Sequence, residues 1–372
     1  MKRIGNLYMT ICSFENCRQA ILKASKGKRK RRNVLRILQN LDEYAERLSN
    51  MLREHKYDPS PYSVRWINDG IKQKRRKLAK PRFWPDQCVH HALDNVTAPI
   101  FTKGMYYYCT GSVKGRGCAR SKKGIEKFIR KYPKKARYVF KMDIKKYYDT
   151  ISHKRLIQTI KRYIKDPEVI WLYQSIINSF PAKAATKEEN FTKEELERGI
   201  PIGIDPSRWL CNLLLQPLDH AIKRFLGKGY FMTRYVDDIV VIGPNKRKLH
   251  KLRKFIDEYL KHMGQCIKEN WQVFRLEKRP IDFLGYKFYK DRTTIRKTLL
   301  KRIKRKIKKI SKMKKVSFRN AAGMISYMGW VKNSNSVHFR NKYIKNKISI
   351  KRLRKVVKNE GIIYRETPKN MD

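Results

Sequence analysis

Two adjacent carboxylates carry the clearest chemical signal in the sequence. Asp237 and Asp238 stand in the run Tyr235-Val236-Asp237-Asp238, between the apolar pairs and runs Phe231-Met232 and Ile239-Val240-Val241-Ile242. The apolar flanks predict two strands around a polar hairpin tip. Adjacent acids repel each other, and Asp-Asp is a poor two-residue turn without glycine. A bound cation would relieve the repulsion, while an ordinary polar turn is the alternative.

A third acid, Asp143, lies upstream of this hairpin. The residues Tyr138 to Met142 are typical of a short strand, so Asp143 stands where that strand ends. The next helical stripe begins only at Leu156, and Asp149 or Ser152 is better placed to cap that helix. Asp143 is therefore available for metal binding.

Three acids on two neighbouring strands could hold two Mg²⁺ ions, which prefer oxygen ligands and keep positions for substrate phosphates. Mn²⁺ could substitute. Paired ions about 4 Å apart activate an attacking 3′-hydroxyl and stabilise a leaving pyrophosphate. The sequence thus predicts Asp143, Asp237 and Asp238 as both the catalytic and the metal-binding residues.

The elements that position these acids follow from the hydrophobic pattern. From about Arg137 the chain alternates between strand and helix signals. We predict helices over residues 156–164, 209–225 and 249–263, and hairpins over 230–242 and 283–289. The acid-rich segment Lys183 to Glu197 reads as an exposed excursion.

Basic helical segments flank this central region. Apolar residues from Val34 to Leu52 fall on one helical stripe, which follows the basic run Lys26 to Arg32. Beyond Thr293 the chain is helical and very basic, with Ile303, Ile307 and Ile310 on one face. Ser317 is a plausible N-cap for the helix that follows.

Charge dominates the composition. Lysine and arginine number 90 against 32 acids, which gives a formal net charge of +58 over 372 residues. Such a body repels itself unless a polyanion neutralises it, and nucleic acid is the natural partner because its counterions are released on binding. The sequence contains no stretch of about 18 apolar residues, so no segment is expected to span a bilayer. The first residues do not resemble a signal peptide. We therefore expect a cytoplasmic protein without a membrane partner.

Cysteine and histidine give no sign of a structural site. The seven cysteines include no C-x-x-C pair, so neither a disulfide framework nor a zinc ribbon is expected. His90 and His91 are neighbours, and consecutive side chains point in different directions, which makes them poor joint metal ligands.

Asp143 and the Tyr235–Asp238 run resemble the two catalytic motifs of reverse transcriptases. The resemblance extends over almost the whole chain: residues 71–101 and 106–122 look like the fingers of bacterial enzymes, 283–286 like the primer-grip hairpin, and 326–330 like the thumb. It implies an α+β right-hand polymerase fold whose antiparallel palm sheet carries the catalytic aspartates. The expected domains are 1–132 (N-terminal extension and fingers), 133–292 (palm) and 293–372 (basic helical thumb).

The resemblance also implies RNA-directed DNA synthesis, with template RNA, a primer or cDNA strand, and dNTPs as partners. Most reverse transcriptases read Gln-Gly-x-x-x-Ser-Pro between the two aspartate motifs, whereas this chain reads Ile202-Gly203-Ile204-Asp205-Pro206-Ser207-Arg208. The Ile-Gly start resembles the error-prone enzymes of diversity-generating retroelements, which read Ile-Gly-x-x-x-Ser-Gln. Arg208 departs from their glutamine. Such an enzyme would work with a small basic helical accessory protein.

Other interpretations stay open. The neighbouring one is a defence-associated or otherwise uncharacterised bacterial reverse transcriptase. A catalytically inactive RNA-binding scaffold is a weaker alternative, and an RNA-dependent RNA polymerase would more often read Gly-Asp-Asp. We find no signature of an intron-type paired-cysteine endonuclease or of a retron enzyme, and about 80 residues beyond the palm are too few for both a thumb and a ribonuclease H domain.

The family resemblance assigns further residues to the nucleotide. Tyr148 would lie beneath the sugar and exclude a 2′-hydroxyl, against the alternative of a core tyrosine. Lys114 and Arg116, in a glycine-punctuated loop, could close over the triphosphate. Gly203 and Ser207 would shape the surface that faces template and nucleotide, and Lys268 could act near the leaving pyrophosphate.

A last group of residues is expected to contact nucleic acid. Its members come from the motif region, the two hairpins and the basic C-terminal helix, where backbone contacts carry little base information. They are Arg208, Tyr235, Gly285, Lys301, Lys304 and Lys308.

Overall fold

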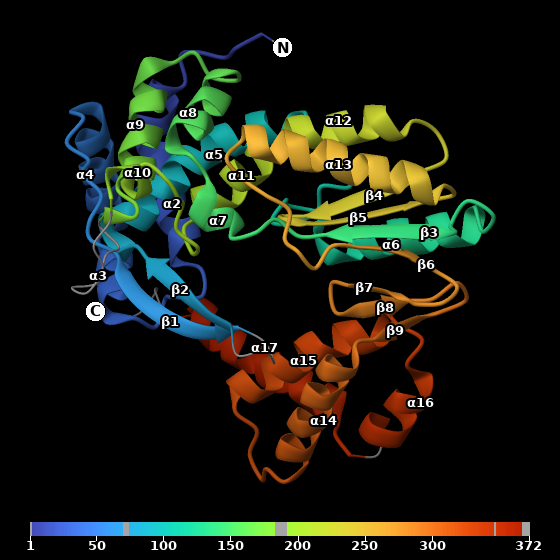
Figure 1. Cartoon of the computed structure of the whole chain (residues 1–372). Coiled ribbons are helices and arrows are strands. Elements are labelled where there is room, and N and C mark those ends of the chain that lie inside the picture. The colour runs from blue at the N-terminus through green and yellow to red at the C-terminus, as the bar shows by residue number, and fades with distance from the viewer. Residues whose placement is uncertain (1, 70–73, 183–191, 346, 367–372) are drawn as a thin grey trace. The chain divides into compact units, whose positions relative to one another are not determined.

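The structure is a computed structural model that describes residues 2–69, 74–182, 192–345 and 347–366 (Figure 1). Its contacts divide the chain into two units. The first unit comprises residues 1–121, 140–241 and 246–273, and the second comprises 122–139, 242–245 and 274–372.

Helices begin the first unit. They are α1 (Tyr8–Cys12), α2 (Phe14–Ser25), α3 (Arg32–Gln39) and α4 (Leu41–Arg53). The single stripe expected from Val34 to Leu52 is split, because Asn40 leaves helical geometry at φ −113° and ψ 45°. The hairpin of β1 (Ser63–Asp69) and β2 (Lys74–Lys80) follows, and then η1 (Phe83–Gln87) and α5 (Cys88–Lys103), which packs on α2.

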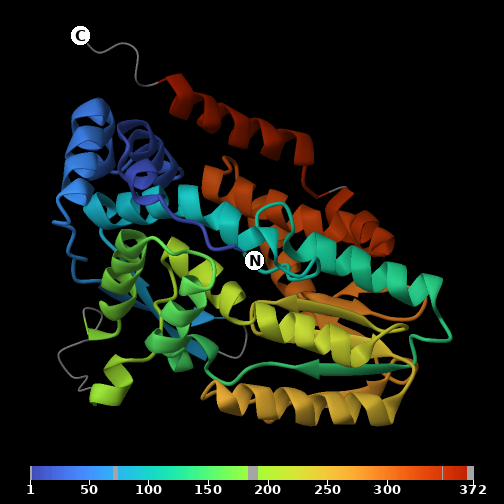
Figure 2. The same cartoon turned by 90° about the horizontal axis from the view of Figure 1, so that it is seen from above.

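A four-stranded sheet lies at the centre of the site region, in the order β4-β5-β3-β6. Its strands are β3 (Tyr138–Met142), β4 (Phe231–Tyr235), β5 (Asp238–Gly243) and β6 (Gln272–Arg275). Helices α12 (Gln216–Leu226) and α13 (Lys246–His262) lie side by side along this sheet (Figures 1 and 2). The expected stripe on α13 is confirmed, since Leu249, Leu252, Ile256 and Leu260 are buried.

Short helices connect β3 to β4. They are α7 (Tyr147–Thr150), α8 (His153–Lys161), α9 (Pro167–Asn178), α10 (Lys193–Leu196) and α11 (Asp205–Leu214). The Ser152 hydroxyl accepts from Arg155 N and caps α8, which confirms one of the two predicted caps. Part of the expected acid-rich excursion, residues 183–191, lies outside the described residues.

The helix predicted over residues 209–225 is instead two helices, α11 and α12. The break falls at Leu215, just before Gln216-Pro217. Proline has no N–H to continue the helical ladder, and its ring clashes with the preceding turn. A new helix therefore starts there.

The second unit combines most of α6 (Gly117–Lys131) with a three-stranded sheet of β7 (Ile281–Phe283), β8 (Tyr286–Phe288) and β9 (Thr293–Ile295). Its remaining helices are α14 (Lys297–Ser311), α15 (Phe318–Lys332), α16 (Val337–Arg340), η3 (Asn341–Lys345) and α17 (Ile350–Glu366). Ile303, Ile307 and Ile310 are buried, as their spacing predicts.

The β7–β8 hairpin is closed by Leu284 and Gly285, both at positive φ (50° and 81°). Two such residues are typical of the tight turns that match strand twist. A Cβ at position 285 would lie 2.7 Å from the Trp330 ring of α15, so only glycine fits. The hairpin predicted over residues 283–289 is therefore present, with a turn fixed by close packing.

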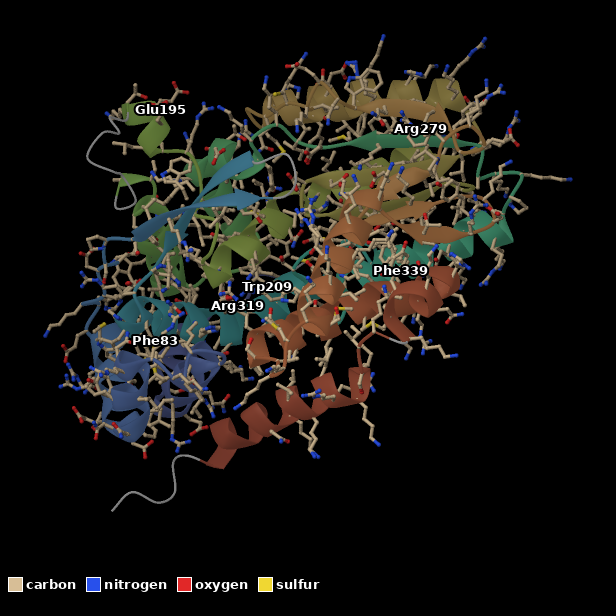
Figure 3. The ribbon with its side chains drawn as sticks, turned by 90° about the horizontal axis from the view of Figure 1, so that it is seen from below. Phe83, Glu195, Trp209, Arg279, Arg319 and Phe339 are labelled. Carbon is tan, nitrogen blue, oxygen red and sulfur yellow. The ribbon has the colours of Figure 1, made fainter. Side chains whose placement is uncertain are left out.

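The basic composition is expressed on the surface. Nitrogen-tipped side chains project from α13 and from α17 (Figure 3). None of the helices in the described ranges has the length and hydropathy needed to cross a membrane.

Candidate active site at the β4–β5 hairpin

The hairpin tip differs in detail from the sequence prediction. β4 ends at Tyr235 and β5 begins at Asp238, so the connecting residues are Val236 and Asp237 rather than the two aspartates. Val236 has φ +59°, a left-handed conformation that is rare for a β-branched residue. The surrounding structure must hold this turn in place.

Asp143 and Asp237 meet at the sheet. β3 lies beside β5, and Asp143 directly follows β3. The two carboxyl groups share a hydrogen bond. Burial, and then the charge of Asp143, raise the pKa of Asp237 to about 7. Two carboxyl groups within hydrogen-bonding distance cannot both ionise freely without a proton or a cation between them.

Asp238 lies beside a lysine, and its charge also raises the Asp237 pKa. Its Oδ2 lies 3.8 Å from Lys141 Nζ, and both side chains are only partly exposed. Within the described ranges, no three His, Cys, Asp or Glu side chains come close enough to hold a metal ion together. The structure thus brings together two of the three predicted ligands. One or two carboxylates plus substrate phosphates are the usual protein ligands of Mg²⁺, so the Asp143–Asp237 pair fits that ion. The role of Asp238 stays a prediction.

Lys268 lies beside Asp143. Its backbone N–H donates to the Asp143 carbonyl at 2.8 Å, and its Nζ is 3.9 Å from Asp143 Oδ2. The antiparallel bridge between Ile144 and Ile267 sets this register. A positive charge therefore stands next to Asp143, and the role of Lys268 near the pyrophosphate stays a prediction.

A buried arginine holds the hairpin turn through a hydrogen bond. Arg234, on β4, is 0% exposed, and its guanidinium donates to both Asp219 carboxylate oxygens. Its Nη1 also donates to the Val236 carbonyl at 2.7 Å and to Asn212 Oδ1 at 3.0 Å. The strained residue before Asp237 is thus fixed by a buried ion pair.

Asn212 and Gly111 complete this support. Asn212 Nδ2 donates to the Gly111 carbonyl at 2.7 Å. A Cβ on Gly111 would lie 2.6 Å from both the backbone N and Cγ2 of Val236. The backbone of the 108–110 segment pairs with Arg234, through Arg234 N to Tyr108 O and Thr110 N to Arg234 O.

Sequence reasoning missed this network, although one signal was available. Arg234 lies in the first strand of the predicted hairpin, and a charge in a buried strand needs a buried partner of opposite sign. Asp219, in the stretch 209–225 that was predicted to be a largely buried helix, was one such candidate.

The adjacent residues Tyr147 and Tyr148 differ in burial. Tyr147 is 2% exposed, and its hydroxyl donates to the Cys211 carbonyl at 2.6 Å. Tyr148 is only partly buried and its hydroxyl lies against the Cys211 thiol. Burial, with smaller contributions from Cys211 and Asp237, raises the Tyr148 pKa. Tyr147 is a core residue, and Tyr148 keeps an accessible face near Asp237.

In the loop predicted to bind the triphosphate, the Arg116 side chain is hydrogen-bonded to nearby backbone carbonyls. Arg116 Nη1 donates to the Tyr106 carbonyl at 2.6 Å and reaches the carbonyls of Met105 and Cys109. Lys114 is exposed beside Gly115, which has φ +75°. Of the two, Lys114 is the side chain that is open to a ligand.

The motif segment 203–208 is exposed at Gly203 and Arg208, and Ile204, Pro206 and Ser207 between them are buried. Gly203 has φ +123°, and a Cβ there would lie 2.9 Å from the Ala79 carbonyl of β2. Ser207 is 1% exposed. Arg208 is exposed and pairs with Asp205, which also contacts His91. Burial lowers the His91 pKa to about 4, so His91 is neutral at pH 7 and its contact with Asp205 is a hydrogen bond rather than an ion pair.

The remaining predicted nucleic-acid contacts lie in both units. Tyr235 ends β4 and contacts the Cys118 thiol, and Gly285 forms the β7–β8 turn. The α14 lysines 301, 304 and 308 are exposed, and Lys304 Nζ lies 4.1 Å from the Tyr343 ring centroid. Their roles stay predictions.

Residues 78–288 match the family described as "Reverse transcriptase (RNA-dependent DNA polymerase)". A Saccharomyces cerevisiae protein named "Putative COX1/OXI3 intron 1 protein" is 27% identical over 186 residues, which are 49% of this chain and 21% of that protein. The chain therefore spans about a fifth of this curated relative.

The chain is also similar to solved structures. Apo telomerase from Candida Tropicalis superposes with a TM-score of 0.52 at 13% identity, over 80% of this chain and 60% of that one. The Candida Tropicalis telomerase bound to a "TWJ fragment of telomeric RNA" gives 0.47 at 14% identity, over 87% and 59% of the two chains. Together with the family match, the first of these confirms the predicted α+β right-hand polymerase fold.

Proposed function

The chain belongs to the reverse transcriptase family, and on that premise we propose that it is an RNA-directed DNA polymerase. It would copy a template RNA into cDNA by transferring nucleotides from dNTPs to a primer end. The observation that carries this proposal is the contact between Asp143 and Asp237, with the pKa of Asp237 raised to about 7. A carboxyl pair in that state is suited to bind a divalent cation.

The chain's own residues would divide the work. Asp143 and Asp237 would hold Mg²⁺, or Mn²⁺ in its place, and we propose that Asp238 contributes from the neighbouring position. When bound, the metal would activate the 3′-hydroxyl and stabilise the leaving pyrophosphate. Lys268, 3.9 Å from Asp143 Oδ2, would bring positive charge to the pyrophosphate.

Substrate selection would depend on the residues around the pair. The open face of Tyr148 would lie under the sugar, and Lys114, with Arg116 shaping its loop, would approach the triphosphate. Gly203 and Ser207 would support the surface beneath the nucleotide, the latter from its buried position.

Nucleic-acid binding follows from the charge of +58. We propose that residues 1–132, 133–292 and 293–372 act as extension with fingers, palm and thumb. Arg208, Tyr235 and Gly285 would face template or primer. The lysines of α14 would track the duplex backbone.

The Ile202–Arg208 motif favours, within the family, the error-prone enzyme of a diversity-generating retroelement. That reading implies a small basic accessory protein as partner. A defence-associated reverse transcriptase is the second candidate, because Arg208 replaces the retroelement glutamine. Sequencing the cDNA made from a defined RNA separates them, since the first predicts substitutions concentrated opposite adenine.

Primer extension tests the core proposal. The Asp237→Asn protein should lose dNTP incorporation on a primed RNA template by several orders of magnitude, because one of the two metal-binding carboxylates is gone. The matched control is Asp257→Asn, which alters a partly exposed aspartate on α13 that pairs with Lys261 at 3.5 Å. Near-normal extension by folded Asp237→Asn protein would reject the mechanism. An inactive wild type that still binds primed RNA would favour the scaffold alternative.

A further inference from the structure

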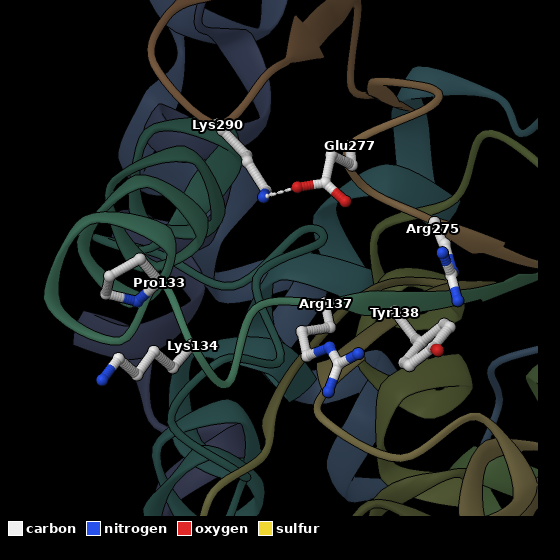
Figure 4. A pocket seen from close by; sticks show the side chains of 7 residues that line it. All are labelled: Pro133, Lys134, Arg137, Tyr138, Arg275, Glu277 and Lys290. Atoms are coloured by element: carbon white, nitrogen blue, oxygen red, sulfur yellow. Dashed lines mark hydrogen bonds and ion pairs between the residues drawn. The ribbon is translucent and has the colours of Figure 1, made fainter.

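A basic cavity opens in the second unit. Its volume is about 560 Å³, and it is lined by Lys134, Arg137, Tyr138, Arg275, Glu277 and Lys290 (Figure 4). All these residues belong to the second unit. Tyr138 begins β3, whereas Asp143 follows the other end of that strand. The cavity is therefore a different site from the one described above.

The lining has an excess of positive charge. Glu277 is the only carboxylate among the described residues that line the cavity, against four cations. That carboxylate is engaged by Lys290 Nζ, and this pairing lowers the Glu277 pKa. In Figure 4 the Glu277–Lys290 pair lies on one side of the cavity and Arg137 with Tyr138 on the other. Lys134, Arg137 and Arg275 thus give the cavity a net positive charge that its own acid does not balance.

Backbone pairing and an aromatic ring arrange the two arginines. Leu276 N donates to the Arg137 carbonyl at 2.9 Å, which joins the segment after β6 to the segment before β3. The guanidinium carbons of Arg137 and Arg275 lie 5.7 and 5.8 Å from the Tyr138 ring centroid. Guanidinium groups held against a ring lose less freedom when they bind a ligand. The geometry therefore gathers two planar guanidinium groups around one aromatic ring.

Two such forks are suited to a phosphate group. Arginine binds phosphate oxygens through two parallel N–H donors, whereas an apolar ligand would find few partners here. The polyanion that a chain of this charge and family must hold is nucleic acid.

We propose that this cavity holds a phosphodiester of a bound RNA strand between Arg137 and Arg275, as an anchoring contact outside the catalytic site. The choice of RNA rests on the proposed function, because the template is the strand that extends beyond the point of copying. The contact recognises the backbone and is indifferent to sequence.

The test measures binding of a single-stranded RNA oligonucleotide across a range of salt concentrations. The variant is Arg137→Ala/Arg275→Ala, made in the Asp237→Asn background so that catalysis does not enter. The charge-matched control is Arg279→Ala/Arg292→Ala, whose guanidiniums lie over Phe274 and Tyr289 in the same unit and do not line the cavity. Losing one phosphate contact on a single strand should reduce the log–log salt slope by about 0.7.

We expect that reduction for the cavity variant and an unchanged slope for the control. Arg137→Lys/Arg275→Lys should fall between wild type and the alanine variant, because it keeps the charge and loses the fork. Equal slopes for the cavity variant and the control would overturn the proposal, as would a change seen with a DNA oligonucleotide and not with RNA. Failure of the proposed function would show separately, as absent primer extension by the wild-type chain.

Discussion

The buried Arg234–Asp219 pair allows a sharp test of how the active-site hairpin is held. The change is Asp219→Asn, which keeps the shape of the side chain and removes its charge. Arg234 is 0% exposed and donates to both Asp219 oxygens. After the substitution its guanidinium would be buried without a counter-charge, while Asn212 and the Val236 carbonyl could still accept from it.

The expected cost follows from that geometry. Removing one partner of a buried ion pair costs about 3–5 kcal/mol, and the retained amide oxygen favours the lower end, about 3 kcal/mol. The control Asp257→Asn breaks a partly exposed pair at 3.5 Å from Lys261 and should cost less than about 1 kcal/mol. Urea unfolding of both proteins gives the two values directly.

A second variant separates stability from positioning. Asp219→Leu/Arg234→Met replaces the pair with apolar side chains and should recover much of the lost stability. It also removes the hydrogen bond from Arg234 to the Val236 carbonyl, so we expect primer extension to be low and to need more Mg²⁺. A stable double variant with wild-type extension would refute the positioning argument. An Asp219→Asn protein as stable as wild type would refute the energetic one.

Three further predictions rest on other residues. Tyr148→Ala should keep measurable dNTP activity and lower discrimination against ribonucleotides by roughly 30- to 1000-fold, equivalent to about 2–4 kcal/mol; an unchanged ratio of kcat/KM for dATP and ATP would make Tyr148 a core residue. Gly111→Ala should disable extension and lower Tm, because its Cβ would lie 2.6 Å from the backbone N of Val236; wild-type behaviour would mean that the turn can shift freely. Asp94→Asn should become increasingly more stable than wild type between pH 4 and pH 8, because burial raises the Asp94 pKa from 3.8 to about 8. The folded protein then retains a proton that the unfolded chain releases, so the free energy of unfolding of the wild type falls as pH rises, by at most about 1.4 kcal/mol per pH unit. Parallel curves of unfolding free energy against pH for the two proteins would show that Asp94 is ionised.

Local sequence patterns predicted the elements that carry the site. The alternation around Tyr235-Val236-Asp237-Asp238 placed a hairpin there, and the strand before Asp143 ends where expected. The Ser152 cap and the buried isoleucines of α14 followed from equally local rules. Such features depend on neighbouring residues alone, which is why one sequence was enough.

Side-chain partners were harder to predict, because they depend on contacts between distant segments. Nothing local distinguishes Asp237, which meets Asp143, from Asp238, which lies near Lys141. Arg116 looked free to bind phosphate, yet its Nη1 donates to carbonyls of its own loop. Arg234 on β4 bonds to side chains of α11 and α12. The sequence of one strand does not show which helices will pack against it.

The contact between Gly285 and Trp330 has a mechanical consequence for the second unit. There is no room between the hairpin turn and α15, where even one added methyl group would collide with the Trp330 ring at 2.7 Å. The Tyr286 ring also packs against the Trp330 ring, with 4.8 Å between the ring centroids. Arg296 N donates to the Gly285 carbonyl at 2.8 Å. We therefore expect the turn and the helix to move together. If the hairpin contacts a primer, as predicted, a displacement of α15 would also displace that contact.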